Sequence, residues 1–309
     1  MTISEANAKA REGRIGGSSA PTVFGCNPYA QPVDEWLRLT GKRGPVDLSD
    51  NMAVHMGNVL EETLLKTAAE KHGWEDFTLA SALGDPSYTK EVDEVALVSH
   101  LDGCRLQTRS VVECKNRSAQ MASQYGEDGG GAEDVLLSDY VQCQHQMLVG
   151  DENGKPWDSA YLVAYFGGGD LRVFHFPRDD AFIEEELLPA YRKFWLYVQT
   201  DERPPMTYGH PSVKKYITEF HDDIDGEIKS LGNRGDVLHA QIQEANQQIK
   251  FFNQQKEQAR EELLDMMGTA YVGTLADGTA YRRAMVERKG YSVEPSSSIQ
   301  MRHVKRWAK

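Results

Sequence analysis

Three charged residues near the middle of the chain have the types and spacing that metal-assisted chemistry on a phosphate requires. Asp102 begins an Asp-Gly pair, and Glu113 and Lys115 follow the apolar run Ser110–Val112. Side chains alternate along a strand, so Glu113 and Lys115 are expected on one face and Cys114 on the other. Two carboxylates can hold a divalent cation, while the ammonium beside them can orient a water or offset charge that develops on a phosphate.

Two short strands are predicted to position these residues. Val95–Val98 and Ser110–Val112 are apolar or β-branched runs, and the Asp-Gly pair between them is a turn signal. We therefore predict neighbouring strands, with Asp102 at the end of the first and the charged residues at one edge of the sheet. The apolar lead-in favours a buried strand end. The alternative is an exposed turn beside a solvated Glu–Lys pair, which would do no chemistry.

A helix predicted from about residue 51 to residue 71, ended by a His-Gly pair, adds another carboxylate. Glu61 shares the apolar face of this helix, whereas Glu62 lies four residues before Lys66, as a surface ion pair would. A carboxylate on an apolar face needs a partner, because burial without one destabilises its charged form. Glu61 is therefore expected either at the exposed margin of that face or in the metal site.

A second helix, predicted over Leu136–Val149, is dense in amides around positions 142 to 146. Such a helix is normally solvated, and we interpret His145 within it as structural. Residues 157–166 and 170–177 alternate like two strands joined by a Gly-rich turn. With a helix at 178–200, these elements predict an α/β domain that ends near Pro205, over residues 1–205.

Residues 206–309 have a different pattern, which predicts a coiled coil or a long helical hairpin followed by a β-hairpin near residues 271–281. The apolar residues keep a three- and four-residue spacing, broken at Gly235 and Lys256: Ile224, Ile228, Leu231, Leu238, Ile242, Ala245, Ile249, Phe252, Ala259, Leu263 and Met266. This face could fold back within the chain, pack on the first domain or pair between chains. Residues 281–309 hold eight Lys or Arg against two Glu, as a nucleic-acid contact or a solvated tail would.

Composition narrows the functional classes. The formal net charge of −13 disfavours a passive nucleic-acid binder, but an enzyme with acidic metal ligands and local basic segments can carry it. The four cysteines have no Cys-x-x-Cys spacing, which disfavours zinc and iron–sulfur sites and suits a reducing cytoplasm. We expect no membrane partner, because no apolar run approaches membrane-spanning length, and the N-terminus lacks the apolar core of a signal peptide.

The ordered set of motifs resembles one known family. Asp102 followed by Glu113-x-Lys115 is similar to the PD-(D/E)xK nuclease signature, and the flanking sequence resembles the phage lambda exonuclease family of YqaJ-like viral recombinases. The matching pieces occur in the family's order at residues 14–19, 57–61, 102–103, 113–115 and 140–146. The resemblance implies a restriction-endonuclease-like core, in which helices flank a mixed central sheet.

The resemblance also implies an activity. It predicts a Mg²⁺-dependent 5′-to-3′ exonuclease on double-stranded DNA ends, with Mn²⁺ as a substitute, that leaves 3′ single strands for recombination by strand annealing. It further implies a homo-oligomer (a ring trimer), a single-strand annealing protein as partner, and a phage or prophage protein in the bacterial cytoplasm. The alternatives are an endonuclease of the same fold, of restriction or repair type, and a non-catalytic DNA-binding assembly protein.

Site residues follow from the same resemblance. The metal ligands would be Glu61, Asp102, Glu113 and the backbone carbonyl of Cys114, with Lys115 beside them. A glutamine of the amide-rich helix would lie at the active site, and the candidates are Gln142 and Gln144. The terminal 5′-phosphate would be held by Arg14, Ser18 and Ser19.

Overall fold

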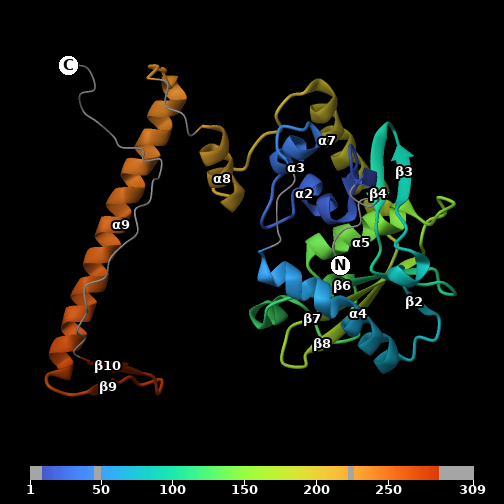
Figure 1. The fold of residues 1–309 in the computed structure, drawn as a ribbon. Helices are drawn as coiled ribbons and strands as arrows, with labels where there is room; N and C mark the ends of the chain where they lie inside the picture. Colours follow the sequence, from blue (N-terminus) through green and yellow to red (C-terminus); the bar gives the residue numbers. More distant parts are fainter. Residues whose placement is uncertain (1–8, 45–49, 222–225, 285–309) are drawn as a thin grey trace. The chain divides into compact units, whose positions relative to one another are not determined.

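The computed structural model describes residues 9–44, 50–221 and 226–284, and contacts within the chain divide it into two units, Met1–Ile217 and Thr218–Lys309 (Figure 1). Most of the predicted basic tail, residues 285–309, lies outside the described residues. None of the helices in the described residues is both long and apolar enough to cross a bilayer.

The first unit has a mixed α/β fold built around a five-stranded sheet. In the order β2-β5-β6-β7-β8, its strands are β2 (Phe77–Leu79), β5 (Gly103–Arg105), β6 (Ser110–Asn116), β7 (Ser159–Tyr165) and β8 (Leu171–Pro177). β6 runs parallel to β7, and the other neighbouring pairs are antiparallel. The hairpin predicted for residues 157–177 is therefore confirmed.

The prediction that Val95–Val98 and Ser110–Val112 form neighbouring strands is wrong. β4 (Val95–Ser99) belongs to a separate three-stranded sheet, between β1 (Ile15–Gly16) and β3 (Tyr88–Val92). Asp102 lies where the chain passes from this sheet to β5, and a local turn signal cannot tell which strands pair.

The expected position at a sheet edge also needs correction, because β6 is the central strand. β5 nevertheless pairs with β6 only as far as Gly103↔Val112. The segment of β6 from Glu113 onward therefore has no β5 residue beside it, and this local end of the ladder leaves room for a site.

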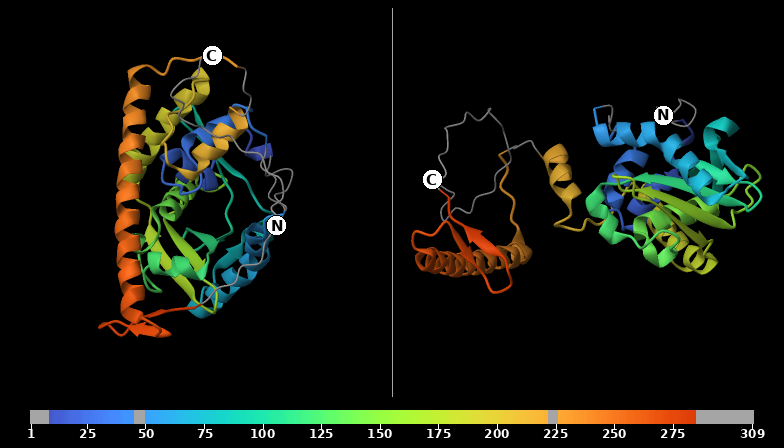
Figure 2. Two further views of the ribbon diagram at one scale, coloured as in Figure 1. Left: turned by 90° about the vertical axis from the view of Figure 1, so that its left-hand side faces the viewer. Right: turned by 90° about the horizontal axis from the view of Figure 1, so that it is seen from below.

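Helices cover both faces of the five-stranded sheet. Val112 and Cys114 pack in a cluster with Leu65 and Ala68 of α4 (Met52–His72). Residues that alternate with these two on the sheet, such as Val111 of β6, belong to the larger core with α5 (Leu137–Val149). The alternation predicted for β6 is thus confirmed, and it sends Glu113 and Lys115 toward α5. The ribbons of α4 and α5 lie on opposite faces of this sheet (Figures 1 and 2).

The ends of α4 follow its sequence. The Asn51 side chain accepts hydrogen bonds from the backbone N–H groups of Ala53 and Val54, and Gly73 ends the helix with φ of 64°. An N-cap oxygen satisfies free backbone donors, and glycine adopts the left-handed conformation without a Cβ clash. The predicted helix over residues 51–71 is confirmed.

The remaining helices of the first unit pack around α5 and its sheet. They are α2 (Ala20–Phe24), α3 (Pro32–Leu39), α6 (Asp180–Phe182), a π-helical turn (Ile183–Leu187), α7 (Leu188–Thr200) and α8 (Pro211–Phe220). Tyr216 of α8 is buried in the main core, and Ser212 accepts a hydrogen bond from Gln31 Nε2 at 3.1 Å. Contacts thus extend the first unit to Ile217, whereas the functional boundary at residue 205 stays a prediction.

The second unit consists of α9 (Gly232–Met267) and an antiparallel pair, β9 (Val272–Thr274) and β10 (Ala280–Arg282). The predicted β-hairpin is confirmed. The predicted helix begins later than the apolar spacing indicated, because Gly226–Leu231 is irregular. Three glycines at positions 226, 232 and 235 explain the late start, since each one weakens a helix.

Candidate active site

A pocket of about 670 Å³ opens beside α4, the crossover at Asp102 and the end of β6. Its lining includes Glu61, Asp102, Cys114 and Lys115, together with Arg11 from the N-terminal segment. Four segments that are distant in the sequence thus contribute charged groups to one cavity. The lining of this pocket does not include three residues on the α5 side of β6: Glu113 and Gln142, which contact Lys115, and Gln146, which contacts Glu113.

Asp102 takes the place of the missing β5 residue beside β6. Its Oδ2 accepts a hydrogen bond from the Cys114 backbone N–H at 2.8 Å. An extended residue directs its N–H and C=O to the same side of the strand, so the Cys114 carbonyl also faces this end of the ladder. Burial, followed by the negative charges of Glu113 and Glu61, raises the pKa of Asp102 well above its ordinary value.

Glu113 is buried, and its two carboxylate oxygens accept three short hydrogen bonds. Lys115 Nζ and Gln142 Nε2 donate to Oε1 at 2.6 and 2.5 Å, and Gln146 Nε2 donates to Oε2 at 2.6 Å. Lys115 Nζ also donates to Gln142 Oε1 at 2.9 Å. Burial alone would lower the pKa of Lys115, but the carboxylates of Glu113, Asp139 and Asp102 outweigh it and raise that pKa, so the side chain is a cation at neutral pH.

The two adjacent glutamates of α4 behave differently, as their spacing predicts. Both line the main pocket, but only Glu61 is half-buried, and burial, then the charge of Glu113, raises its pKa. Glu62 is exposed and accepts a hydrogen bond from Lys66 Nζ at 2.6 Å, the surface pair expected one turn along a helix.

Sequence reasoning chose Gln142 and Gln144, but the structure brings Gln142 and Gln146 to Glu113. Gln144 lies on another side of α5, where its amide donates to the Pro177 carbonyl and accepts from the Asp179 N–H. A spacing of two residues places side chains on different sides of a helix, whereas a spacing of four places them on the same side. That spacing was present in the sequence and would have identified Gln146.

His145, interpreted as structural, is fully buried between two partners. The Val98 carbonyl can only accept, so Nε2 carries the proton and donates to it at 3.0 Å, while Nδ1 accepts from the Tyr191 hydroxyl at 2.7 Å. Burial lowers the pKa of His145 to about 4, so the ring is neutral near pH 7.

The predicted phosphate-binding residues are not gathered in one place. Ser18 is exposed and lines the main pocket, whereas Ser19 is half-buried and does not line it. The Arg14 guanidinium donates to the backbone carbonyls of Ala10 and Glu12. Arg11, which sequence reasoning missed, lines the pocket and points its Nε toward His100 Nδ1 at 3.5 Å.

A smaller pocket of about 220 Å³ shares Ser18 and Lys115 with the main one. Arg117 also lines it, and so does the buried Asp139, which accepts hydrogen bonds from Arg117 Nη2 and the Tyr125 hydroxyl at 2.6 and 2.5 Å. The two cavities thus share a serine and a lysine in their linings.

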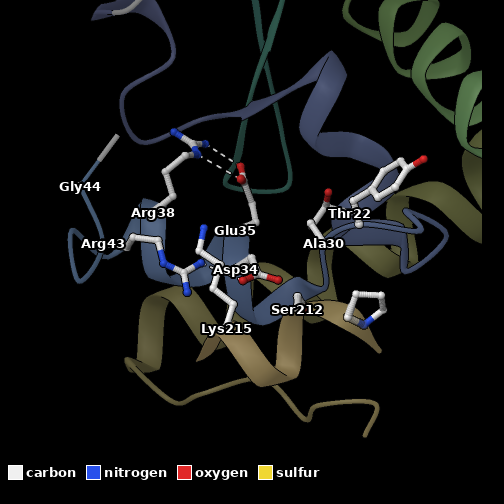
Figure 3. A pocket seen from close by; sticks show the side chains of 11 residues that line it. Thr22, Ala30, Asp34, Glu35, Arg38, Arg43, Gly44, Ser212 and Lys215 are labelled. Atoms are coloured by element: carbon white, nitrogen blue, oxygen red, sulfur yellow. Dashed lines mark hydrogen bonds and ion pairs between the residues drawn. The ribbon is translucent and has the colours of Figure 1, made fainter. Parts of the chain in front are cut away.

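Another pocket, of about 380 Å³, lies between α3 and α8 (Figure 3). Two pairs of its charged groups neutralise each other, with Arg38 bound to Glu35 at 2.6 Å and Arg43 bound to Asp34 at 2.7 Å. We assign no chemistry to it.

Among the described residues, no group of three or more His, Cys, Asp or Glu side chains converges closely enough to form a metal site. The donors around the main pocket nevertheless suit a hard divalent cation. Glu61 and Asp102 offer carboxylate oxygens whose pKa values are raised by burial and then by the charge of Glu113, and a cation would offset both effects. Glu113 is engaged by Lys115 and the two glutamines, so it would have to exchange a partner to join them.

Comparison with known proteins places the site within a recognised domain. Residues 8–153 match the YqaJ-like viral recombinase domain, a range that contains the whole lining of the main pocket. A phage-related exonuclease from Haemophilus somnus 129PT is 12% identical, with a TM-score of 0.39 over 61% of this chain and 96% of its own. A candidate exonuclease from Eubacterium rectale is 12% identical, with a TM-score of 0.44 over 75% of this chain and 97% of its own. No curated protein matches the chain.

Proposed function

Because residues 8–153 carry a YqaJ-like viral recombinase domain, we propose that the chain is a Mg²⁺-dependent exonuclease that degrades double-stranded DNA from its 5′ ends. The observation that carries the proposal is the pocket that holds Glu61, Asp102 and Lys115 at the open end of the β5–β6 ladder. Carboxylates beside a half-buried lysine ammonium suit phosphodiester hydrolysis. The product would be a 3′ single strand, the substrate of an annealing protein.

We propose a PD-(D/E)xK active site with Asp102, Glu113 and Lys115 as its signature residues. The cation, Mg²⁺ or Mn²⁺, would be held by Glu61, Asp102, Glu113 and the Cys114 carbonyl. When bound, such a cation polarises the phosphate and lowers the pKa of the attacking water. The Asp102–Cys114 hydrogen bond fixes the carboxylate against the backbone whose carbonyl would be the neighbouring ligand.

Besides the metal cation, the ammonium of Lys115 places a positive charge at the reacting phosphate. Its ammonium already donates to Glu113 and Gln142, so it is oriented before substrate arrives. A preoriented cation stabilises transition-state charge without reorganising at the moment of reaction. Gln142 and Gln146 act as positioning residues, since both hold Glu113.

The adjoining small pocket is the place we propose for the 5′-phosphate. Ser18 and Lys115 line both cavities, so a phosphate in the smaller one would lie next to the scissile bond in the larger. Arg14 and Ser19 remain proposals for this role, and Arg14 would first have to release the carbonyls of Ala10 and Glu12. Arg11 needs no such change, because it already lines the main pocket.

The assembly implied by the family, a ring trimer threaded by DNA, and a single-strand annealing partner also remain proposals. A ring around the DNA would explain how a chain with a net negative charge stays bound to its substrate.

Matched variants test the catalytic assignment. Lys115→Ala and Glu113→Gln should each lower the rate of linear duplex degradation in Mg²⁺ by ~10² or more, the scale of losing one transition-state charge contact. Lys66→Ala, which removes an exposed lysine paired with Glu62, is the control and should retain the wild-type rate. Wild-type rates in both Lys115→Ala and Glu113→Gln would remove the proposed active site.

A further inference from the structure

The longest helix of the chain carries an apolar seam that no described residue buries. α9 spans Gly232–Met267, and none of its side chains is buried. The exposed fractions of Ile242, Ile249 and Phe252 are 46, 57 and 62%. Apolar side chains that repeat along one stripe of a helix require a partner surface, since water disfavours them.

The seam keeps an alternation of four- and three-residue steps, as the a and d positions of a heptad repeat do, with Lys256 as its one charged position. In order, its positions are Leu238, Ile242, Ala245, Ile249, Phe252, Lys256, Ala259, Leu263 and Met266. The positions that flank its centre are uncharged amides: Gln241, Asn246, Gln248, Asn253 and Gln255. The positions that flank the centre of the stripe therefore bring no like charges together when two copies approach each other.

We propose that the seam is occupied by α9 of a second copy of this chain, packed antiparallel about a two-fold axis between residues 250 and 251, a contact additional to those that a ring trimer would use. The sizes of the seam residues are complementary about that point. In this register Ile249 faces Phe252 of the partner subunit, and Leu238 faces the partner's Leu263.

The small residues of the seam favour the same register. Ala245 would face the partner's Lys256, and Ile242 would face the partner's Ala259, so each small residue meets a long one. A parallel pair would instead place Ala245 against its own copy and Lys256 against another lysine. The pair of alanines would leave a gap between the helices, and the pair of lysines would repel each other.

The shape of the second unit supports this arrangement. A pocket of about 450 Å³ lies between Ala259 and Leu263 of α9 and the strand β10, where Tyr281 and Arg282 line it. In the antiparallel register this pocket lies opposite Leu238 and Ile242 of the partner subunit, whose apolar side chains would enter it. The basic residues that line this pocket are Lys256, Arg260, Arg282 and Arg283, whereas α9 as a whole carries six Asp or Glu against four Lys or Arg and so does not offer a continuous basic surface to nucleic acid.

Two adjacent phenylalanines provide a matched test on the full chain. Phe252 lies on the seam, whereas Phe251, of similar exposure at 55%, lies off it. In sedimentation equilibrium, Phe252→Asp should weaken self-association by about 100-fold or more, since a dimer loses two buried rings, and Phe251→Asp should associate like wild type. A monomeric wild type, with the seam covered by its own chain, would overturn the proposal. So would equal association in both variants.

Cross-linking tests the register independently of the strength of association. In the antiparallel pair, Ala245 of one copy faces Lys256 of the other, while the two Ala245 positions are about 16 Å apart along the axis. A short bismaleimide should join two copies of an Ala245→Cys, Lys256→Cys double variant but not copies of Ala245→Cys alone, with the wild-type cysteines as the blank. Efficient cross-linking of Ala245→Cys alone would show a parallel pair and refute the register.

Discussion

Replacing Asp102 by Asn separates two effects of this carboxylate in one variant. The Asn side-chain oxygen can still accept the Cys114 N–H, so the hydrogen bond observed at 2.8 Å is kept. The negative charge is lost. Because burial and the charges of Glu113 and Glu61 raise the pKa of Asp102, its ionised form opposes folding when no cation is present.

The sign and the pH window follow from that raised pKa. A carboxyl group whose folded-state pKa is raised contributes its full stability below the unfolded pKa of about 3.9, and that stability is lost as the pH rises through the folded-state pKa. Each unit of pKa difference corresponds to about 1.4 kcal/mol. In EDTA at pH 7, we expect Asp102→Asn to be more stable than wild type by more than about 1 kcal/mol, and the gain should vanish toward pH 4.

In Mg²⁺ we expect the opposite order, with wild type more stable than Asp102→Asn. A cation that binds only the folded wild type stabilises it by about 2.7 kcal/mol at one hundred times its dissociation constant, and the Asn variant should lose most of this gain. Urea unfolding, followed by tryptophan fluorescence between pH 4 and pH 8 with EDTA or Mg²⁺, measures both effects. Asp158→Asn, at an exposed aspartate, is the control and should change little. The reasoning is refuted if Asp102→Asn is the less stable protein in EDTA at pH 7.

Three further outcomes follow from the contacts of α4 and α5. Glu61→Gln should lower metal affinity, so that added Mn²⁺ partly restores DNA cleavage, while Glu62→Gln should match wild type in the same titration. Gln146→Ala should slow cleavage by removing a donor to Glu113, whereas Gln144→Ala should lower the free energy of unfolding by about 1 kcal/mol with little change in rate. Because the pKa of His145 is lowered to about 4, the fold should lose up to about 3 kcal/mol between pH 6.5 and pH 4. His145→Gln should flatten that part of the curve of unfolding free energy against pH, and an unchanged slope would contradict this origin.

Local signals in the sequence were sufficient for much of the fold. The Asn51 cap and Gly73 set the ends of α4 as predicted, because capping depends only on adjacent residues. The alternation along β6 correctly put Glu113 and Lys115 on one face, since the period of a strand is independent of its partners.

Features that depend on pairing between distant segments were not predictable in the same way. The Asp-Gly pair at residue 102 was interpreted as a turn between paired strands, but β4 joins a different sheet. Arg11 reaches the pocket only because the N-terminal segment packs beside β4, an arrangement that no local pattern encodes. Gln146 differs from these two, since its four-residue spacing from Gln142 was visible in the sequence.

The central claim, metal-dependent cleavage that begins at a 5′ end, is tested most directly by comparing DNA ends. Linear duplex is labelled within its 5′-terminal nucleotide, and that nucleotide carries either a 5′-phosphate or a 5′-hydroxyl. Each substrate is incubated with the protein and Mg²⁺, beside a closed circle of the same sequence. We predict early release of labelled mononucleotide, faster from the phosphorylated end, no loss of the circle, and no release in EDTA or by Lys115→Ala. Cleavage of the closed circle would instead indicate an endonuclease, and an intact linear duplex in Mg²⁺ and in Mn²⁺ would contradict the proposed activity altogether.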